Sequence, residues 1–321
     1  MYINRRQFLE MTATAAALIS LGGAFTSCKK DGDPPYGISR RSLGKTGLNV
    51  SLLSVGGWNI GRDILSDNES IAIMRTAIDE GINFFDNAWS YHDGRSEELM
   101  GKALQDGYRQ RVILMTKHLS REPEKAKQHL EDSLRRLQTD VIDVWQIHEL
   151  MTLDEVDQVY TSGLLDYLEN VKKSGKIRFI GFTGHANPEV HMEMINRGFN
   201  WDTVQMPVNI LDYHYLSFSK NVLPLAIEKN IGIIAMKTLA GTPGVLFQNG
   251  IASVSECLRF ALTLPVSTVS SGMDSMEILR ENIETARNFT PMTQVEIENL
   301  VALSLEPSKD GKYESYKSVE I

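Results

Sequence analysis

Eight apolar, β-branched runs alternate with amphipathic segments along this chain, and that rhythm constrains the fold more than any other feature. Near-continuous apolar strands that alternate with helices are typical of a parallel sheet covered by helices. Eight such units predict an α/β fold of the (β/α)8 TIM barrel type rather than an open sheet. The expected strands are residues 52–56, 83–88, 112–117, 141–148, 179–184, 203–208, 232–237 and 267–272.

The segments between these strands carry the apolar spacing of amphipathic helices. That spacing predicts helices over residues 70–80, 124–137, 166–173 and 216–229. Cys257 lies in a fifth helical pattern and is interpreted as a small buried apolar residue.

Both ends of the barrel region have their own signals. Residues 40–51 contain Gly44 and Gly47 around a turn, which predicts an N-terminal β-hairpin that closes the bottom of the barrel. Residues 291–321 contain one helical pattern followed by a polar end that we expect to fray. No Pro- or Gly-rich linker interrupts the regular part, so we expect residues 38–321 to form one domain.

The first 37 residues are interpreted as an export signal and a tether. Arg5 and Arg6 precede an apolar stretch, residues 11–25, that is too short to span a membrane comfortably. Residues 1–28 resemble a twin-arginine signal joined to a bacterial lipoprotein box, and residues 29–37 form a polar tether. We therefore expect an exported protein, periplasmic or anchored to the outer membrane through a lipidated Cys28. The alternative is a hydrophobic leader that contains a cysteine by chance.

Charge and cysteine content exclude several classes of partner. The net charge is −8 and no basic block stands out, so we expect no nucleic-acid partner and no acidic membrane surface. The two cysteines are Cys28 and Cys257, and since Cys28 belongs to the signal we expect no disulfide. No pattern indicates an oligomeric state.

Four polar residues follow the predicted strands. Asp86, Lys117 and His148 fall at strand ends, and Tyr91 lies just beyond the first of them. Chemistry in barrels of this kind sits at the carboxyl ends of the strands, so we expect these side chains to converge. A structural ion pair between Asp86 and Lys117 is the alternative for that pair alone.

These residues resemble those of the aldo-keto reductase family, over about residues 38–290. The resemblance implies an NAD(P)H-dependent oxidoreductase that reduces an aldehyde or ketone, or oxidises the alcohol. The matching motifs are residues 41–47, 85–88 with Tyr91, 96–98, Lys117, 147–148, 180–182, 204–205 and 281–282.

The resemblance also implies a role for each of the four residues. Tyr91 would be the general acid, and the Lys117 ammonium would lower its pKa from about 10. Asp86 would hold Lys117 charged and oriented. His148 would donate a hydrogen bond to the carbonyl oxygen of the substrate.

The implied cofactor is NADP(H), with NAD(H) as the alternative. Gln205 is expected to bind the nicotinamide amide, Met236 to pack on the ring, and Arg280 is the candidate cation for a 2′-phosphate. The further expected cofactor residues are Gly57, Trp58, Thr183, Gly184, His185, Lys237, Gly272, Met273, Glu281 and Asn282.

Trp58, Trp89, His92 and His118 lie in segments that follow strands, where substrate contacts are expected. Aromatic rings and histidines there suggest a polar, ring-shaped substrate such as a sugar or glycoside. The alternative is that the tryptophans only wall the mouth of the barrel.

Two other functions stay open on the sequence. His92, His118, His148 and His185, with Asp86 and Glu149 nearby, could hold a divalent metal for hydrolysis. That reading leaves Lys117 and Tyr91 unexplained, so no metal ligand is predicted. A barrel that binds the nucleotide without turnover is the third interpretation.

Overall fold

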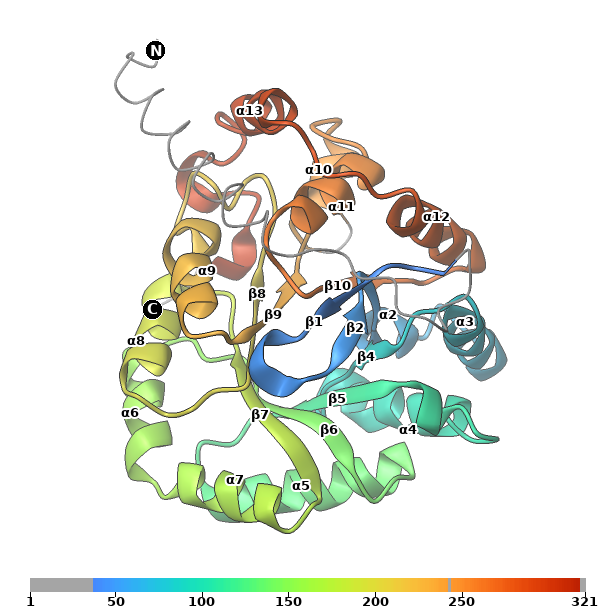
Figure 1. Ribbon diagram of the computed structural model, residues 1–321, viewed down its shortest axis with the longest axis vertical. Coiled ribbons are helices and arrows are strands. Elements are labelled where there is room, and N and C mark those ends of the chain that lie inside the picture. Colours follow the sequence, from blue (N-terminus) through green and yellow to red (C-terminus); the bar gives the residue numbers. More distant parts are fainter. Residues whose placement is uncertain (1–36, 242–243, 318–321) are drawn as a thin grey trace.

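The computed structural model describes residues 37–241 and 244–317 of the chain (Figure 1). Its centre is a closed barrel of parallel strands in the order β10-β3-β4-β5-β6-β7-β8-β9. The predicted (β/α)8 barrel is confirmed, and each expected strand is present within one or two residues at either end. The strands are β3 (Leu53–Gly56), β4 (Phe84–Asp86), β5 (Ile113–His118), β6 (Ile142–Ile147), β7 (Ile177–Thr183), β8 (Thr203–Pro207), β9 (Gly232–Met236) and β10 (Thr268–Gly272).

The expected export signal (residues 1–28) and most of the tether lie outside the described residues. The prediction that residues 1–28 direct export therefore stays a prediction.

Helices surround the barrel (Figure 1), and the four predicted helices correspond to α3, α5, α7 and α9. Several begin with a capping box; in α3, for example, Ser66 and Glu69 satisfy each other's backbone N–H groups. None of the helices in the described ranges is long and apolar enough to span a membrane. The helices are α2 (Gly57–Ile60), α3 (Asp67–Asp79), α4 (Arg95–Ala103), α5 (Pro123–Leu137), α6 (Leu153–Thr161), α7 (Leu164–Lys173), α8 (Pro188–Asn196), α9 (Phe218–Glu228), α10 (Val245–Gln248), α11 (Val254–Thr263), α12 (Met276–Arg287) and α13 (Gln294–Leu303).

The N-terminal hairpin closes one end of the barrel, as predicted. Strands β1 (Arg40–Ser42) and β2 (Asn49–Ser51) pair antiparallel and lie across the middle of the barrel in Figure 1. Leu43 and Val50 are fully buried. They pack in one cluster with the inward side chains Phe84, Met115, Val144 and Ile234. This apolar plug fills the amino-terminal half of the barrel, so a cavity can form only toward the other end.

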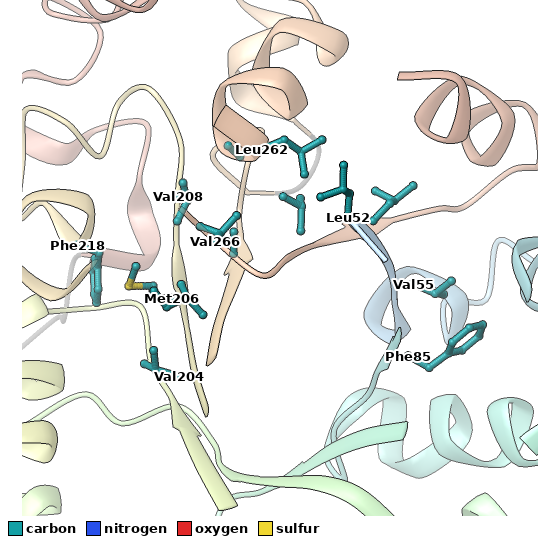
Figure 2. Close-up of a cluster of buried hydrophobic side chains, with 14 of the residues drawn as sticks. Leu52, Val55, Phe85, Val204, Met206, Val208, Phe218, Leu262 and Val266 are labelled. Atoms are coloured by element: carbon teal, nitrogen blue, oxygen red, sulfur yellow. The ribbon is translucent and has the colours of Figure 1, made fainter. Parts of the chain in front are cut away.

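The larger core lies between the strands and the helices. Val204 and Met206 of β8 and Phe218 of α9 belong to it, as do Val55 of β3 and Phe85 of β4 (Figure 2). Burial of this surface stabilises the barrel by roughly 25 cal/mol per Å² of apolar area.

Strand alternation sets which residues reach the cavity. Side chains alternate between the two faces of a strand, so residues two apart point the same way. Asp86 lies two residues after Phe84, and Lys117 lies two residues after Met115. Asp86 and Lys117 therefore continue the inward rows that begin in the apolar plug.

The prediction of a frayed C-terminal end is wrong as far as residue 317. After α13 the chain forms two 3₁₀ turns, Lys309–Gly311 and Ser315–Lys317. Glu314 and Lys317 are buried, with exposures of 0% and 3%. The polar composition of this segment reflects a buried ion cluster rather than solvent exposure. Cys257 in α11 is buried, as predicted.

Candidate active site

A cavity of about 1220 Å³ lies at the carboxyl ends of the barrel strands. It exceeds the roughly 300–1,000 Å³ of ordinary small-molecule sites. Its lining runs from Asp86, Tyr91 and His148 to Asn282 and Phe289. The space therefore suits a long ligand that reaches from the barrel centre to α12.

Three of the predicted catalytic residues are joined by one ammonium group. Lys117 is 1% exposed and its Nζ pairs with Asp86 Oδ1. The same Nζ donates to the Asn87 carbonyl at 2.6 Å and lies 3.4 Å from the Tyr91 hydroxyl oxygen. The sequence predicts that these three side chains lie close together, and in the structure they are in contact.

The second oxygen of Asp86 is also fully used. Asp86 Oδ2 accepts from Gln205 Nε2 at 2.6 Å and from Ser270 Oγ at 2.7 Å. The carboxylate therefore links β4 to β5, β8 and β10 across the barrel. Ser270 was not predicted as a partner of Asp86, because β10 and β4 are far apart in the sequence although only β3 separates them in the barrel.

The electrostatics of Tyr91 differ from the expectation. Burial raises the pKa of Tyr91 above 10.0, and the Lys117 ammonium only opposes this rise. Burial alone would lower the pKa of Lys117. The interactions of its ammonium with Asp86 and Tyr91 outweigh this effect, so the pKa of Lys117 lies above 10.5. Lys117 lowers the pKa of Tyr91 as expected, but burial outweighs this effect, since removing a phenolate from water costs more than one nearby ammonium returns.

His148 lies beside Tyr91 with its ring set edge-on, the two ring centroids being 5.6 Å apart. Burial holds the pKa of His148 well below 6.5, and the Lys117 charge lowers it further. The imidazole is therefore neutral near pH 7 and carries one N–H. It lines the cavity and is 9% exposed.

The turn that carries Tyr91 has an unusual backbone. His92, Asp93 and Gly94 have φ values of 50°, 55° and 94°. Non-glycine residues seldom adopt this left-handed region, and it is enriched at functional sites. A Cβ on Gly94 would lie 2.4 Å from Arg136 Cζ, so the turn rests directly on that guanidinium.

Arg136 and Glu97 hold this turn in position through hydrogen bonds. Arg136 Nη1 donates to the Trp89 carbonyl at 3.0 Å and pairs with Glu97 at 3.3 Å. Glu97 is 0% exposed and also accepts from Thr116, the neighbour of Lys117, at 2.7 Å. The pair thus ties the tyrosine turn to the lysine strand. Glu97 belongs to a matched motif, but its partner Arg136 could not be identified from the sequence.

Two buried acceptors in the cavity have no partner. Within the described part of the chain, Gln205 Oε1 and Asn282 Oδ1 are buried without a hydrogen bond, and both residues line the cavity. An amide or amino N–H of a nicotinamide or an adenine would satisfy such acceptors. These two residues therefore fit the hydrogen-bond donors of a nicotinamide dinucleotide.

Most of the predicted cofactor residues line this cavity, but Met273, Gly184 and Arg280 do not. Met273 is fully buried in the core. Gly184 lies behind the wall, where a Cβ would come within 2.3 Å of the Leu150 carbonyl oxygen, so its role is close packing. Those in the lining are Gly57, Trp58, Thr183, His185, Gln205, Met236, Lys237, Gly272, Glu281 and Asn282.

Of the predicted substrate residues, Trp58 alone is in the cavity lining. Its side chain is 46% exposed and meets the Tyr91 ring edge-on at 5.2 Å. His92 instead binds the Trp58 carbonyl through Nε2 at 2.8 Å. His92 therefore supports Trp58 rather than the substrate.

Trp89 and His118 face away from the cavity. Trp89 stacks on His129 at 3.8 Å and donates to Asp132 on α5. His118 is fully buried against Trp145 at 4.3 Å, in the outward register of β5. The structure gives no support for a substrate role of either residue, because each points into the helix layer.

The histidines of the metal alternative do not come together. His118 faces outward, His92 contacts a carbonyl, and His185 lies between Glu149 Oε1 and the Tyr316 carbonyl, at 3.2 and 3.1 Å. Across residues 37–241 and 244–317, no three His, Cys, Asp or Glu side chains form a group that could hold a metal ion.

A barrel with a Lys–Asp–Tyr contact in its mouth and a long cavity defines a class of nicotinamide-dependent oxidoreductases. Comparison with known families agrees: the sequence profile described as Aldo/keto reductase family matches residues 52–250. The chain belongs to the aldo/keto reductase family. Family membership supports a nicotinamide dinucleotide, NAD(P), as its cofactor.

Individual relatives are distant but cover most of the chain. An uncharacterised oxidoreductase of Bacillus subtilis, YqkF, is 28% identical over 87% of this chain and 99% of its own length. L-galactose dehydrogenase of Arabidopsis thaliana is 28% identical over 85% of this chain and 96% of its own. Among solved structures, the aldo-keto reductase AKR11C1 from Bacillus halodurans in its holo form is 26% identical. It covers 88% of this chain and 100% of its own, with a TM-score of 0.70.

Proposed function

We propose that this protein reduces an aldehyde or ketone with NAD(P)H, or oxidises the corresponding alcohol, with Tyr91 as the general acid or base. The observation that carries the proposal is the Lys117 ammonium, which contacts both Asp86 and the Tyr91 hydroxyl inside the barrel mouth. If Asp86 and Lys117 formed an ion pair with a structural role alone, that role would not require the Tyr91 phenol beside it. The position of that phenol in the cavity lining supports a role in proton transfer.

Each residue has one task in this proposal. When bound, the nicotinamide supplies a hydride to the carbonyl carbon. Tyr91 gives its proton to the carbonyl oxygen, and the Lys117 ammonium stabilises the phenolate that remains. Asp86 fixes the ammonium. His148, neutral because burial lowers its pKa, donates its one N–H to the same carbonyl oxygen and orients it.

Oxidation of NADPH across a panel of aldehydes, followed by absorbance, tests this function. Tyr91→Phe is expected to lower kcat by about 10²- to 10⁴-fold while the cofactor still binds. Tyr108→Phe is the matched control, because its hydroxyl contacts Asp79 at 3.2 Å outside the cavity. Cofactor binding by the parent without turnover of any aldehyde would favour the turnover-deficient alternative instead.

The choice between NADPH and NADH depends on the charges near a 2′-phosphate. Arg280 is exposed and is not in the cavity lining. Arg62 and Arg259 line the cavity, but Arg62 pairs with Asp274 at 2.9 Å and Arg259 pairs with Glu296 at 2.6 Å. These pairings weaken the expected NADP(H) preference, so we propose that the preference for NADPH stays below about tenfold, or ~1.4 kcal/mol. Initial rates at equal concentrations of the two cofactors decide this, and a larger NADPH preference would refute it.

The substrate is proposed to be a sugar or a related hydroxylated carbonyl compound. The half-exposed Trp58 ring beside Tyr91 supports this, since aromatic faces pack against sugar rings. L-galactose dehydrogenase of Arabidopsis thaliana, a relative, acts on a sugar according to its name. Activity restricted to unsubstituted aliphatic aldehydes would contradict this proposal.

Export is proposed from the residues that precede the barrel. Arg5 and Arg6, the apolar residues 11–25 and Cys28 support a twin-arginine signal with lipidation. Changing both arginines to lysine is expected to leave the protein in the cytoplasm. Fractionation of cells that carry the Cys28→Ser variant tests the anchor, and an unchanged membrane fraction would argue against lipidation.

A further inference from the structure

Glu149 occupies a strained and rigid position next to the catalytic histidine. It follows His148 directly and has φ of 61°, a conformation that costs a non-glycine residue free energy. Its carbonyl accepts from Arg121 at 3.1 Å, and the next amide, Leu150 N–H, donates to the Thr183 carbonyl at 2.9 Å. Arg121 is itself 9% exposed. The backbone is therefore fixed in a way that aims this side chain at the cavity, which Glu149 lines.

His185 keeps the Glu149 carboxylate ionised. The Nδ1 of His185 faces the Tyr316 carbonyl oxygen at 3.1 Å, and its Nε2 faces Glu149 Oε1 at 3.2 Å. A carboxylate oxygen can only accept hydrogen bonds, so His185 Nε2 is the donor in its contact with Glu149. This hydrogen bond lowers the pKa of Glu149 below 4.5.

One side of this carboxylate is free to bind a ligand. Its side chain is 42% exposed, and no hydrogen bond within the described part of the chain reaches Oε2. Glu149 directly follows His148 and lines the same cavity, so this acceptor faces the space that would hold the carbonyl compound. A carboxylate accepts hydroxyl hydrogens well and repels other anions.

We infer that Glu149 selects the substrate: a neutral carbonyl compound whose hydroxyl group, on a carbon close to the carbonyl, donates to the Glu149 carboxylate. Polyhydroxylated aldehydes and ketones of the sugar type satisfy this requirement. Carbonyl compounds that carry a carboxylate or a phosphate at the same place are disfavoured. This inference rests on the proposed reductase function and names the residue that would recognise the hydroxyl group of the substrate.

Three aldehydes separate these cases: glyceraldehyde, propanal, which has the same carbon number without hydroxyls, and succinic semialdehyde, which carries a carboxylate. In Glu149→Gln, kcat/KM for glyceraldehyde is expected to fall about ten- to hundredfold relative to propanal, mainly through KM. The rate with succinic semialdehyde is expected to rise. Asp154→Asn is the matched control, because it removes the same charge from an exposed position on α6 outside the cavity lining.

Fluorescence titration with NADPH shows whether Glu149→Gln keeps its folded cofactor site. Equal losses for glyceraldehyde and propanal would overturn the inference, and so would a parent enzyme that prefers propanal. In both cases the reductase function stands, because propanal is reduced. A parent that turns over none of the three aldehydes contradicts the proposed function, and the inference fails with it.

Discussion

Replacing Lys317 by methionine would remove the ammonium from a buried ion cluster in the C-terminal segment. Lys317 Nζ donates to Asp212 Oδ1 at 2.8 Å, to the Tyr215 carbonyl at 2.8 Å and to Glu314 Oε2 at 3.0 Å. The exposed fraction of all three charged side chains is 0–1%. Methionine preserves the length of the side chain, so the variant tests the charge rather than the packing.

The cost of this change follows from the partners that remain. Asp212 keeps the backbone amides of Phe218 and Ser219, both at 2.9 Å, so its carboxylate stays hydrogen-bonded. Among the described residues, Glu314 keeps the hydrogen bonds from Tyr316 and Asn209 and loses the ammonium of Lys317. Breaking a buried pair in this way costs about 3–5 kcal/mol, and we expect the free energy of unfolding to fall by that amount near pH 7.

The pH dependence gives the stricter test. Burial raises the pKa of Glu314 above 4.5, and the Lys317 charge limits that rise. Without Lys317 the folded pKa must rise further. A carboxyl whose folded pKa exceeds its unfolded pKa loses stability as the pH rises through the folded value, by about 1.4 kcal/mol per unit. The deficit of Lys317→Met should therefore shrink as the pH falls toward 4.5.

Urea unfolding followed by tryptophan fluorescence, at about pH 5 and about pH 7, measures both quantities. Lys309→Met is the control, since that side chain is 72% exposed, and its stability should match the parent. Adding Glu314→Gln to Lys317→Met should restore part of the loss, because Glu314 is then neutral and the remaining carboxylate, Asp212, keeps its two backbone amides. A deficit below about 1 kcal/mol at pH 7, or one independent of pH, would refute the reasoning.

Three further predictions concern the site. The kcat for reduction should be flat between about pH 6 and 8, because the pKa of His148 lies well below 6.5 and that of Tyr91 above 10.0; a break inside this range in a pH–rate profile would contradict the assignment. Glu97→Gln should lower stability by about 1–3 kcal/mol, since Arg136 loses its carboxylate, and the urea midpoint measures it. The same variant should lower kcat more than it raises KM, because the Tyr91 turn loosens while the cavity keeps its lining; equal changes in both would argue against a positioning role.

The fold could be predicted from the sequence because each strand is buried on both faces. Such strands are continuous apolar runs, and eight of them in alternation with helices leave few architectures. The contact between Asp86, Lys117 and Tyr91 could be predicted as well, because the carboxyl ends of all the barrel strands lie at the same end of the barrel. Both predictions use information that is local to each strand.

Residues that depend on side-chain direction were predicted less well. His118 stands one position after Lys117, so strand alternation turns it outward, and this could have been read from the apolar Met115 two residues before Lys117. Trp89 lies in a turn, where no such alternation exists. Its direction is set by His129 and Asp132 on α5, which the sequence did not connect to it.

Contacts between distant segments account for the remaining differences. The C-terminal segment has the composition of a frayed tail, yet Lys317 finds a carboxylate more than a hundred residues away. Glu149 was considered only as a neighbour of a metal, because its partner His185 comes from the next strand and Tyr316 from the end of the chain. Composition alone reports none of these pairings.

The Asp86 carboxylate connects the proton site to the cofactor site, and its geometry explains why both lie in one cavity. One oxygen pairs with Lys117, so the ammonium stays beside Tyr91. The other accepts from the Gln205 amide, and this donation leaves Gln205 Oε1 as a buried acceptor without a partner in a residue that lines the cavity. Since an amide presents its two donors and its acceptor in fixed directions, Asp86 determines which end of Gln205 remains for the ligand. A single inward carboxylate on β4 therefore orients the ammonium that serves the phenol and the amide that would meet the nicotinamide.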